Sequence, residues 1–190
     1  MGEPAPKITD PKALRALAHP LRWQLLEILG REGTATATQC AQETGESVAN
    51  CSYHLNTLAK YAYVEQAEGG QGREKPWRIV RKDFQVTSIG MDPDGELAAN
   101  AASGAFLDYE LNLIKERSLV THLNPPDWRA AVGVDNTREF LTAAELTELR
   151  SQIRGLMDKF RERRDNPELR PEGAQSVAIF VSSTVAPPKN

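Results

Sequence analysis

The sequence predicts a mainly helical fold with a small β component, and three observations carry this prediction. Apolar residues recur at helical spacing through residues 10–60. Two short β-rich runs follow, at residues 63–68 and 77–81. A glycine-rich basic segment, residues 69–75, separates these runs and is typical of a hairpin loop.

A segment rich in turn formers divides the chain. Residues 88–95 have the sequence Ser-Ile-Gly-Met-Asp-Pro-Asp-Gly. The chain of 190 residues is long enough to bury two small cores. We therefore expect one domain over residues 1–90 and a second over residues 91–190.

Four helices are expected in the first domain. The first begins after Asp10 with Pro11 in its first turn, and the second begins at Pro20. The third covers residues 35–43, and the fourth covers residues 47–59 after a glycine-containing turn. Four helices followed by a basic hairpin are the order of a winged helix-turn-helix. This fold predicts sequence-specific binding of double-stranded DNA.

The fourth helix has two distinct faces. One face forms an apolar stripe that is expected to be buried: Val48, Cys51, Leu55 and Leu58. The other carries the amides, hydroxyls and lysine that suit base edges and phosphates: Ser47, Asn50, Tyr53, Asn56, Thr57 and Lys60. His54 lies on the flank, where it packs against a neighbouring helix or contacts phosphate, and packing is favoured. The alternative for the whole face is an ordinary polar helix exterior.

Charge is distributed unevenly along the chain. The net charge is −3, of which residues 1–90 contribute +1 and residues 91–190 contribute −4. In the predicted wing and its return strand the cations oppose only Glu74: Arg73, Lys75, Arg78, Arg81 and Lys82. Such a local cationic patch favours contact with phosphates, and a solvated charged loop is the alternative.

Several motifs resemble those of ArsR-like transcriptional regulators, in particular the actinobacterial winged-helix branch of that group. The motifs are Ala18-His19-Pro20-Leu21-Arg22, Cys51-Ser52-Tyr53-His54-Leu55, Tyr61-Ala62-Tyr63-Val64-Glu65 and Gly72-Arg73-Glu74-Lys75-Pro76-Trp77-Arg78. The resemblance covers residues 8–81 and implies a homodimeric repressor, or an activator, that binds an imperfect inverted repeat. It also implies DNA contacts by Ser47, Asn50 and Tyr53, and backbone or minor-groove contacts by Arg73 and Lys75.

The sequence departs from the metal-sensing members of that group. Those members carry a Cys-x-Cys pair at the start of the third helix, where this chain has Thr36 and Thr38. Hydroxyls are poor substitutes for thiolates as ligands of soft metals. The two cysteines, Cys40 and Cys51, fall on inward positions, and His19, His54 and His122 show no paired spacing. We therefore expect no metal site and no cofactor, with a Cys40–Cys51 redox switch as a weaker alternative.

The second domain begins with a long helix, residues 96–117. One of its faces is small or apolar: Leu97, Ala101, Gly104, Ala105, Leu111, Ile114 and Ser118. Two half-sites about 34 Å apart require a symmetric partner, so this helix is expected to mediate dimerisation. The alternative is that it packs only within its own chain.

An α+β module is expected beyond this helix. It combines extended segments at residues 128–134 and 139–141, a helix from Thr142 to about Arg164, and a β-rich run at residues 177–181. The helix is expected to bury Leu146, Leu149, Ile153, Leu156 and Phe160. The module either widens the dimer interface, which is favoured, or encloses a small-molecule effector between aromatic walls: Phe106, Tyr109, Trp128 and Phe140.

Other classes of protein are disfavoured. The chain has no run of about 18 apolar residues and no apolar segment near its first residue, so we expect a cytoplasmic protein without a membrane span or signal peptide. It also lacks a phosphate-binding glycine loop, a nucleophile elbow and paired metal ligands, so we expect no enzymatic activity. The alternative function is a winged helix that binds protein without specific DNA recognition.

Overall fold

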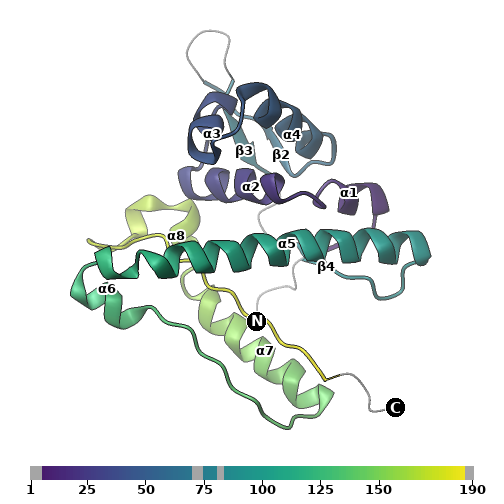
Figure 1. Cartoon of the computed structure of the whole chain (residues 1–190), viewed down its shortest axis with the longest axis vertical. Helices are drawn as coiled ribbons and strands as arrows, with labels where there is room; N and C mark the ends of the chain where they lie inside the picture. Colours follow the sequence, from purple (N-terminus) through teal and green to yellow (C-terminus); the bar gives the residue numbers. More distant parts are fainter. Residues whose placement is uncertain (1–5, 70–74, 81–83, 187–190) are drawn as a thin grey trace. The chain divides into compact units, whose positions relative to one another are not determined.

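The computed structural model describes residues 6–69, 75–80 and 84–186 (Figure 1). The chain forms two compact units, an N-terminal unit over Ala5–His122 and a C-terminal unit from Leu123 onward. The predicted mainly helical fold is confirmed. The structural division lies after His122, whereas the turn formers suggested a division at residues 90 and 91. The reason is that the long helix after the turn packs on the helices that precede it.

The N-terminal unit contains the four helices expected from the sequence. They are α1 (Pro11–Arg15), α2 (Pro20–Glu32), α3 (Ala37–Thr44) and α4 (Val48–Lys60). Each begins at a side-chain cap, and the caps are Asp10, His19, Thr36 and Ser47. In α3 the cap is a full capping box, because the Gln39 side chain also accepts from the Thr36 backbone N–H.

The hairpin after α4 is shorter than the sequence suggested. Strand β2 (Val64–Gln66) pairs antiparallel with β3 (Trp77–Ile79), and Ala35 forms a bridge to Trp77. A second small sheet pairs β1 (Lys7–Ile8) with β4 (Gln85–Val86) in parallel, and the sequence did not predict it. The order of α2, α3, α4 and the hairpin fits a winged helix-turn-helix.

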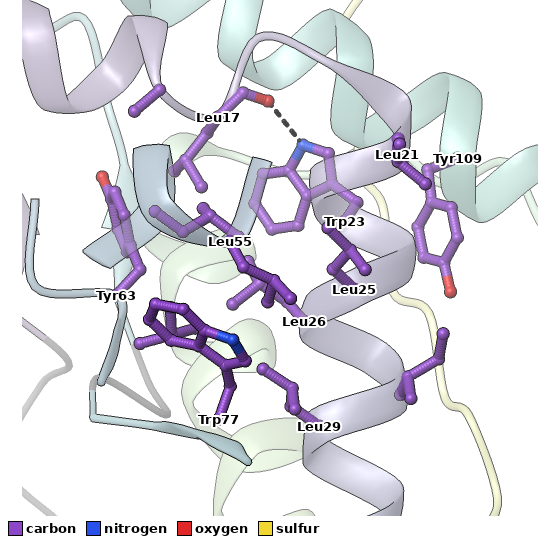
Figure 2. Packing of buried hydrophobic residues seen from close by; sticks show 14 of the residues in the cluster. Leu17, Leu21, Trp23, Leu25, Leu26, Leu29, Leu55, Tyr63, Trp77 and Tyr109 are labelled. Atoms are coloured by element: carbon purple, nitrogen blue, oxygen red, sulfur yellow. Dashed lines mark hydrogen bonds between the residues drawn. The ribbon is translucent and has the colours of Figure 1, made fainter. Parts of the chain in front are cut away.

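One hydrophobic core holds the N-terminal unit together (Figure 2). Helix α2 contributes Leu25 and Leu29, and α4 contributes Leu55, all of which are buried. Two polar groups in this core are satisfied by backbone carbonyls. The Trp23 indole N–H donates to Leu17 at 2.8 Å, and the Tyr63 hydroxyl donates to Ala13 at 3.0 Å. Satisfied groups of this kind avoid the cost of burying a polar atom without a partner.

Helix α5 (Pro93–Leu119) completes the unit by packing against α1 and α2. In Figure 1, α2 lies between α5 on one side and α3, α4 and the hairpin on the other. The buried residues of α5 are Gly95, Ala98, Ala99, Ala102 and Tyr109, none of which belongs to the face expected to mediate dimerisation. Of that expected face, Ala105 packs against the core. Leu97 and Leu111 on the face predicted for dimerisation point outward and are 68% and 48% exposed.

The C-terminal unit differs from the predicted α+β module. Its helices are α6 (Pro126–Ala131), α7 (Ala143–Asp158) and α8 (Glu162–Asp165), with a 3-10 turn η2 (Pro167–Leu169). A further 3-10 turn, η1 (Thr121–Leu123), crosses the boundary between the two units in the sequence. The Thr142 capping box at the start of α7 is present.

Several expectations for the C-terminal unit were wrong. Residues 128–131 are helical, and residues 139–141 and 177–181 form no strand within the part of the unit that the structure describes. A β-rich run becomes a strand only when another strand pairs with it, and the structure describes no strand in this unit that could do so. The predicted stripe of α7 is also not buried, because Leu149, Leu156 and Phe160 are exposed.

Candidate nucleic-acid interface

The turn between α3 and α4 sets the direction of α4. Gly45 ends α3 in the left-handed conformation, with φ 72°, and its N–H donates to the Ala41 carbonyl. Ser47 then caps α4 by accepting from the Asn50 N–H at 3.1 Å. Three members of the predicted stripe, Cys51, Leu55 and Leu58, are fully buried, whereas Val48 is 45% exposed.

The face of α4 opposite this stripe points away from the core. Tyr53 is 64% exposed. Among the other predicted reading residues, Ser47, Asn56 and Lys60 are exposed and Asn50 and Thr57 are half-buried. The structure therefore brings these six residues together on one outward face.

Several of these side chains already form hydrogen bonds to residues near them in the sequence. The Asn50 amide donates to Glu46 at 2.8 Å, and the Asn56 amide donates to the Ser52 carbonyl at 2.8 Å. Bonding to a base edge therefore requires the Asn50 and Asn56 side chains to exchange these local partners. Tyr53 already projects into solvent and needs no such exchange.

The wing is only partly within the described residues. Arg73, Arg81 and Lys82 lie outside them, and Lys75 is exposed. Arg78 does not add a free charge, because its guanidinium pairs with Glu65 at 2.6 Å across the β2–β3 register. The sequence alone did not reveal this pair. Glu65 lies 13 residues before Arg78, and only the pairing of β2 with β3 brings the two side chains together.

His54 is buried, with 5% of its surface exposed, as expected for a residue that packs against a neighbouring helix. Its Nδ1 accepts a hydrogen bond from Arg22 Nε at 3.0 Å, and its ring lies 4.4 Å from that of His19. Burial, followed by the nearby His19 and Arg22, lowers the pKa of His54. Direct phosphate contact would require the ring to leave this site.

Arg22 is a possible contact residue that sequence reasoning missed. It lies in the Ala18–Arg22 motif, but nothing in its spacing connects it with α4. The tertiary structure makes that connection through His54. Arg22 also donates from Nη1 to the Arg15 carbonyl at 3.3 Å.

The two cysteines are buried free thiols. Burial, with a smaller contribution from Cys51, raises the pKa of Cys40 to about 11. Thr36 and Thr38 both belong to the start of α3, and Thr36 is its cap. Within the described ranges, no group of three His, Cys, Asp or Glu side chains could hold a metal ion. Among the helices of the described residues, none combines the length and the hydropathy that a membrane-spanning segment needs.

The four aromatic residues considered as effector walls do not share one unit. Phe106 lies 4.6 Å from Trp23 between ring centroids, and Tyr109 is buried, so both belong to the core of the N-terminal unit. Trp128 and Phe140 belong to the C-terminal unit, where Phe140 is fully exposed.

Comparison with known proteins identifies the domain that contains α4. Residues 17–62 match the family model described as a helix-turn-helix domain. The match spans α2, α3 and α4, which are the elements that place the outward face of α4. No curated protein matches the chain. The chain thus carries a helix-turn-helix domain of the kind that binds DNA in transcription regulators.

Proposed function

We propose that the protein is a sequence-specific transcriptional regulator that binds an inverted-repeat DNA operator as a homodimer. The observation that carries this proposal is the two-sided character of α4. Its inner stripe is fully buried at Cys51, Leu55 and Leu58, while its outer face presents amides, hydroxyls and a lysine. A helix held in this way within a helix-turn-helix domain is suited to the major groove.

Each part of the interface has a distinct role in this proposal. Asn50 and Tyr53 read base edges, with Ser47, Asn56 and Thr57 contacting bases or phosphates around them. Lys60, together with Lys75 and Arg73 of the wing, contacts the DNA backbone. His54 acts from inside the domain and does not contact the DNA.

Homodimerisation is assigned to the outward face of α5. That face presents Leu97 and Leu111 to solvent, with the small residues Ala101 and Gly104 between them. Small residues permit close approach of a symmetry-related helix, and exposed leucines gain stability when they are covered. A homodimer also supplies the second reading helix that an inverted repeat requires.

Repression and a cytoplasmic location are proposed from the resemblance to ArsR-like regulators. A thiolate metal sensor of that group is not proposed, because the expected thiolate positions hold Thr36 and Thr38. We propose no enzymatic activity and no cofactor.

A protein-binding winged helix is the second candidate function. The net charge of −3 and the pairing of Arg78 with Glu65 favour it, because both weaken the attraction to DNA. One experiment separates the two candidates. The full chain is incubated with a pool of random-core duplexes, the bound DNA is selected and sequenced over a salt titration, and the mass of the complex is measured.

Enrichment of an inverted repeat bound by two chains is the expected result. Weak binding without enrichment that disappears by physiological salt would replace the DNA-binding proposal by the protein-binding candidate.

A further inference from the structure

One arginine of the N-terminal unit differs from the other arginines that the structure describes there. Four of them pair with carboxylates: Arg15 with Asp94, Arg31 with Glu27, Glu32 and Glu43, Arg78 with Glu65, and Arg117 with Glu27. Arg22 forms no ion pair within the described part of the chain. Its hydrogen bonds go to neutral acceptors, namely His54 Nδ1 at 3.0 Å and the Arg15 carbonyl at 3.3 Å.

The surroundings of Arg22 favour an external anion. The side chain is half-buried, and burial lowers its pKa from the ordinary arginine value. A guanidinium remains charged under these conditions, so it is partly removed from water without an opposing charge. Its two bonds engage Nε and Nη1, and Nη2 has no acceptor among the described residues. An incoming oxyanion would supply both the missing charge and the missing acceptor.

The location of Arg22 indicates which anion it meets. His54, which holds Arg22, directly follows Tyr53 in α4, and the two rings lie 5.1 Å apart with an edge-on geometry. Tyr53 belongs to the outward face of α4 and is 64% exposed. The guanidinium is therefore held beside the helix that carries the proposed base contacts, where the nearest anions would be backbone phosphates of bound DNA.

We propose that Arg22 binds a phosphate of the DNA backbone next to the bases that α4 contacts, and that His54 positions the Arg22 guanidinium. This inference rests on the proposed DNA-binding function, to which it adds a phosphate contact made by a residue of α2. His54 acts through its unprotonated Nδ1, which accepts the Nε–H of Arg22 and fixes the plane of the guanidinium. Fixing that plane orients the remaining N–H groups before DNA arrives, so less side-chain entropy is lost on binding.

The first test compares Arg22→Gln with Arg129→Gln in the full chain. Both variants remove one positive charge, and Arg129 is an exposed residue of α6 in the other unit. Affinity is measured over a salt titration on the inverted repeat selected from the random-core pool and on a random-sequence duplex of equal length. Arg22→Gln is expected to weaken binding to both duplexes by about tenfold or more per protomer and to lower the salt slope by about 1 per protomer. Arg129→Gln is expected to leave both values unchanged.

The second test separates positioning from simple packing. Asparagine can place an acceptor oxygen near the position of histidine Nδ1, whereas leucine cannot. His54→Leu is expected to lose several-fold in affinity although Arg22 is intact, and His54→Asn is expected to retain wild-type affinity. The double variant Arg22→Gln/His54→Leu should bind no more weakly than Arg22→Gln alone, because both changes remove the same contact. Thermal unfolding of each variant establishes that it is folded.

The possible outcomes separate this inference from the function on which it rests. If the wild-type chain binds neither duplex, the proposed function fails and this inference fails with it. If the wild-type chain binds and Arg22→Gln behaves like Arg129→Gln, only the phosphate contact is overturned. Should Arg22→Gln not fold, Arg22→Lys keeps the cation but loses the Nε donor. It is expected to lower affinity several-fold with an unchanged salt slope, and wild-type affinity would overturn the proposal.

Discussion

The rings of Trp23 and Phe106 lie 4.6 Å apart between centroids at an interplanar angle of 49°, and this contact joins α2 to α5. The Trp23 indole N–H is also anchored to the Leu17 carbonyl at 2.8 Å (Figure 2). Because α2 also packs against α4, the helix proposed for dimerisation and the helix proposed to read DNA are connected through one buried core. A change in the α5 contact can therefore reach α4 without crossing a flexible linker.

Phe106→Ala is expected to destabilise the N-terminal unit by about 2–3 kcal/mol. The reason is that the truncation removes the ring that packs on Trp23 and leaves a partial cavity, and Phe106 is only half-buried. Urea unfolding measures the change. Phe140→Ala is the matched control, because Phe140 is fully exposed and its loss should change the free energy of unfolding by less than about 0.5 kcal/mol. Equal effects of the two substitutions would contradict the core position of Phe106.

Substitutions on α4 and on the wing should affect DNA binding in different ways. Asn50→Ala and Tyr53→Ala are expected to reduce the preference for the selected operator over random DNA, because base contacts carry specificity. Lys75→Ala and Arg73→Ala are expected to weaken binding to both duplexes equally. Each should also lower the salt slope by about 1 per protomer, because each removes one cation of each chain from the DNA backbone.

Salt-titrated affinities on the two duplexes distinguish these patterns. Arg129→Gln, which removes an exposed charge from α6 in the other unit, is the control and should change neither quantity. If all four interface variants weakened binding to both duplexes by the same factor, α4 would not be the reading helix.

The conformational stability of the protein should fall as the pH is lowered below about 6.5. Histidine has a pKa of about 6.5 in an unfolded chain, whereas burial, His19 and Arg22 lower the pKa of His54 in the folded chain, against a smaller opposing effect of Glu46. Between these two pKa values the unfolded chain binds more protons, so the free energy of unfolding decreases as the pH falls through this window.

Urea unfolding at a series of pH values from roughly 7.5 to 5, which spans the titration of histidine, measures this dependence. His54→Asn removes the titrating group and is expected to flatten the curve in that window. An identical pH dependence in wild type and His54→Asn would assign it to other groups.

Cys40 is expected to resist thiol reagents in the folded protein. It is completely buried, and burial raises its pKa to about 11, so the reactive thiolate is scarce at neutral or mildly alkaline pH. Labelling with iodoacetamide at mildly alkaline pH, followed by mass spectrometry of peptides, should show little modification of Cys40 or Cys51 until urea unfolds the chain. Rapid labelling under native conditions, or a Cys40–Cys51 disulfide after mild oxidation, would contradict this prediction and support a Cys40–Cys51 redox switch.

A charged residue on the outward face of α5 should prevent dimerisation. Leu111 is 48% exposed on that face, so Leu111→Glu is tolerated by the isolated chain but places a carboxylate in the proposed interface. Sedimentation should show the wild-type chain as a dimer of 21.0 kDa protomers and Leu111→Glu as a monomer. Leu169→Glu is the matched control, because Leu169 is 50% exposed and lies in η2 of the other unit. A variant that remains dimeric would move the interface away from this face.

Local signals in the sequence were sufficient for much of the N-terminal unit. Asp10, Thr36 and Ser47 were correctly placed at or next to helix starts, because a cap acts on backbone groups within three residues. The spacing of Cys51, Leu55 and Leu58 correctly separated the inner face of α4 from its outer face, because that periodicity follows from helix geometry alone. Trp128 shows the limit of such signals, because a short apolar run without a pairing partner became part of α6.

The sequence by itself determined the order of the helices in the N-terminal unit, the hairpin and the composition of the outer face of α4. Only the tertiary structure decided which distant groups meet: Glu65 with Arg78, His54 with Arg22, and Trp23 with Phe106. It also decided which face of α5 is buried. The physical reason is that capping and helix periodicity act over a few residues, whereas ion pairs, buried hydrogen bonds and core packing depend on surfaces that meet only when the chain has folded.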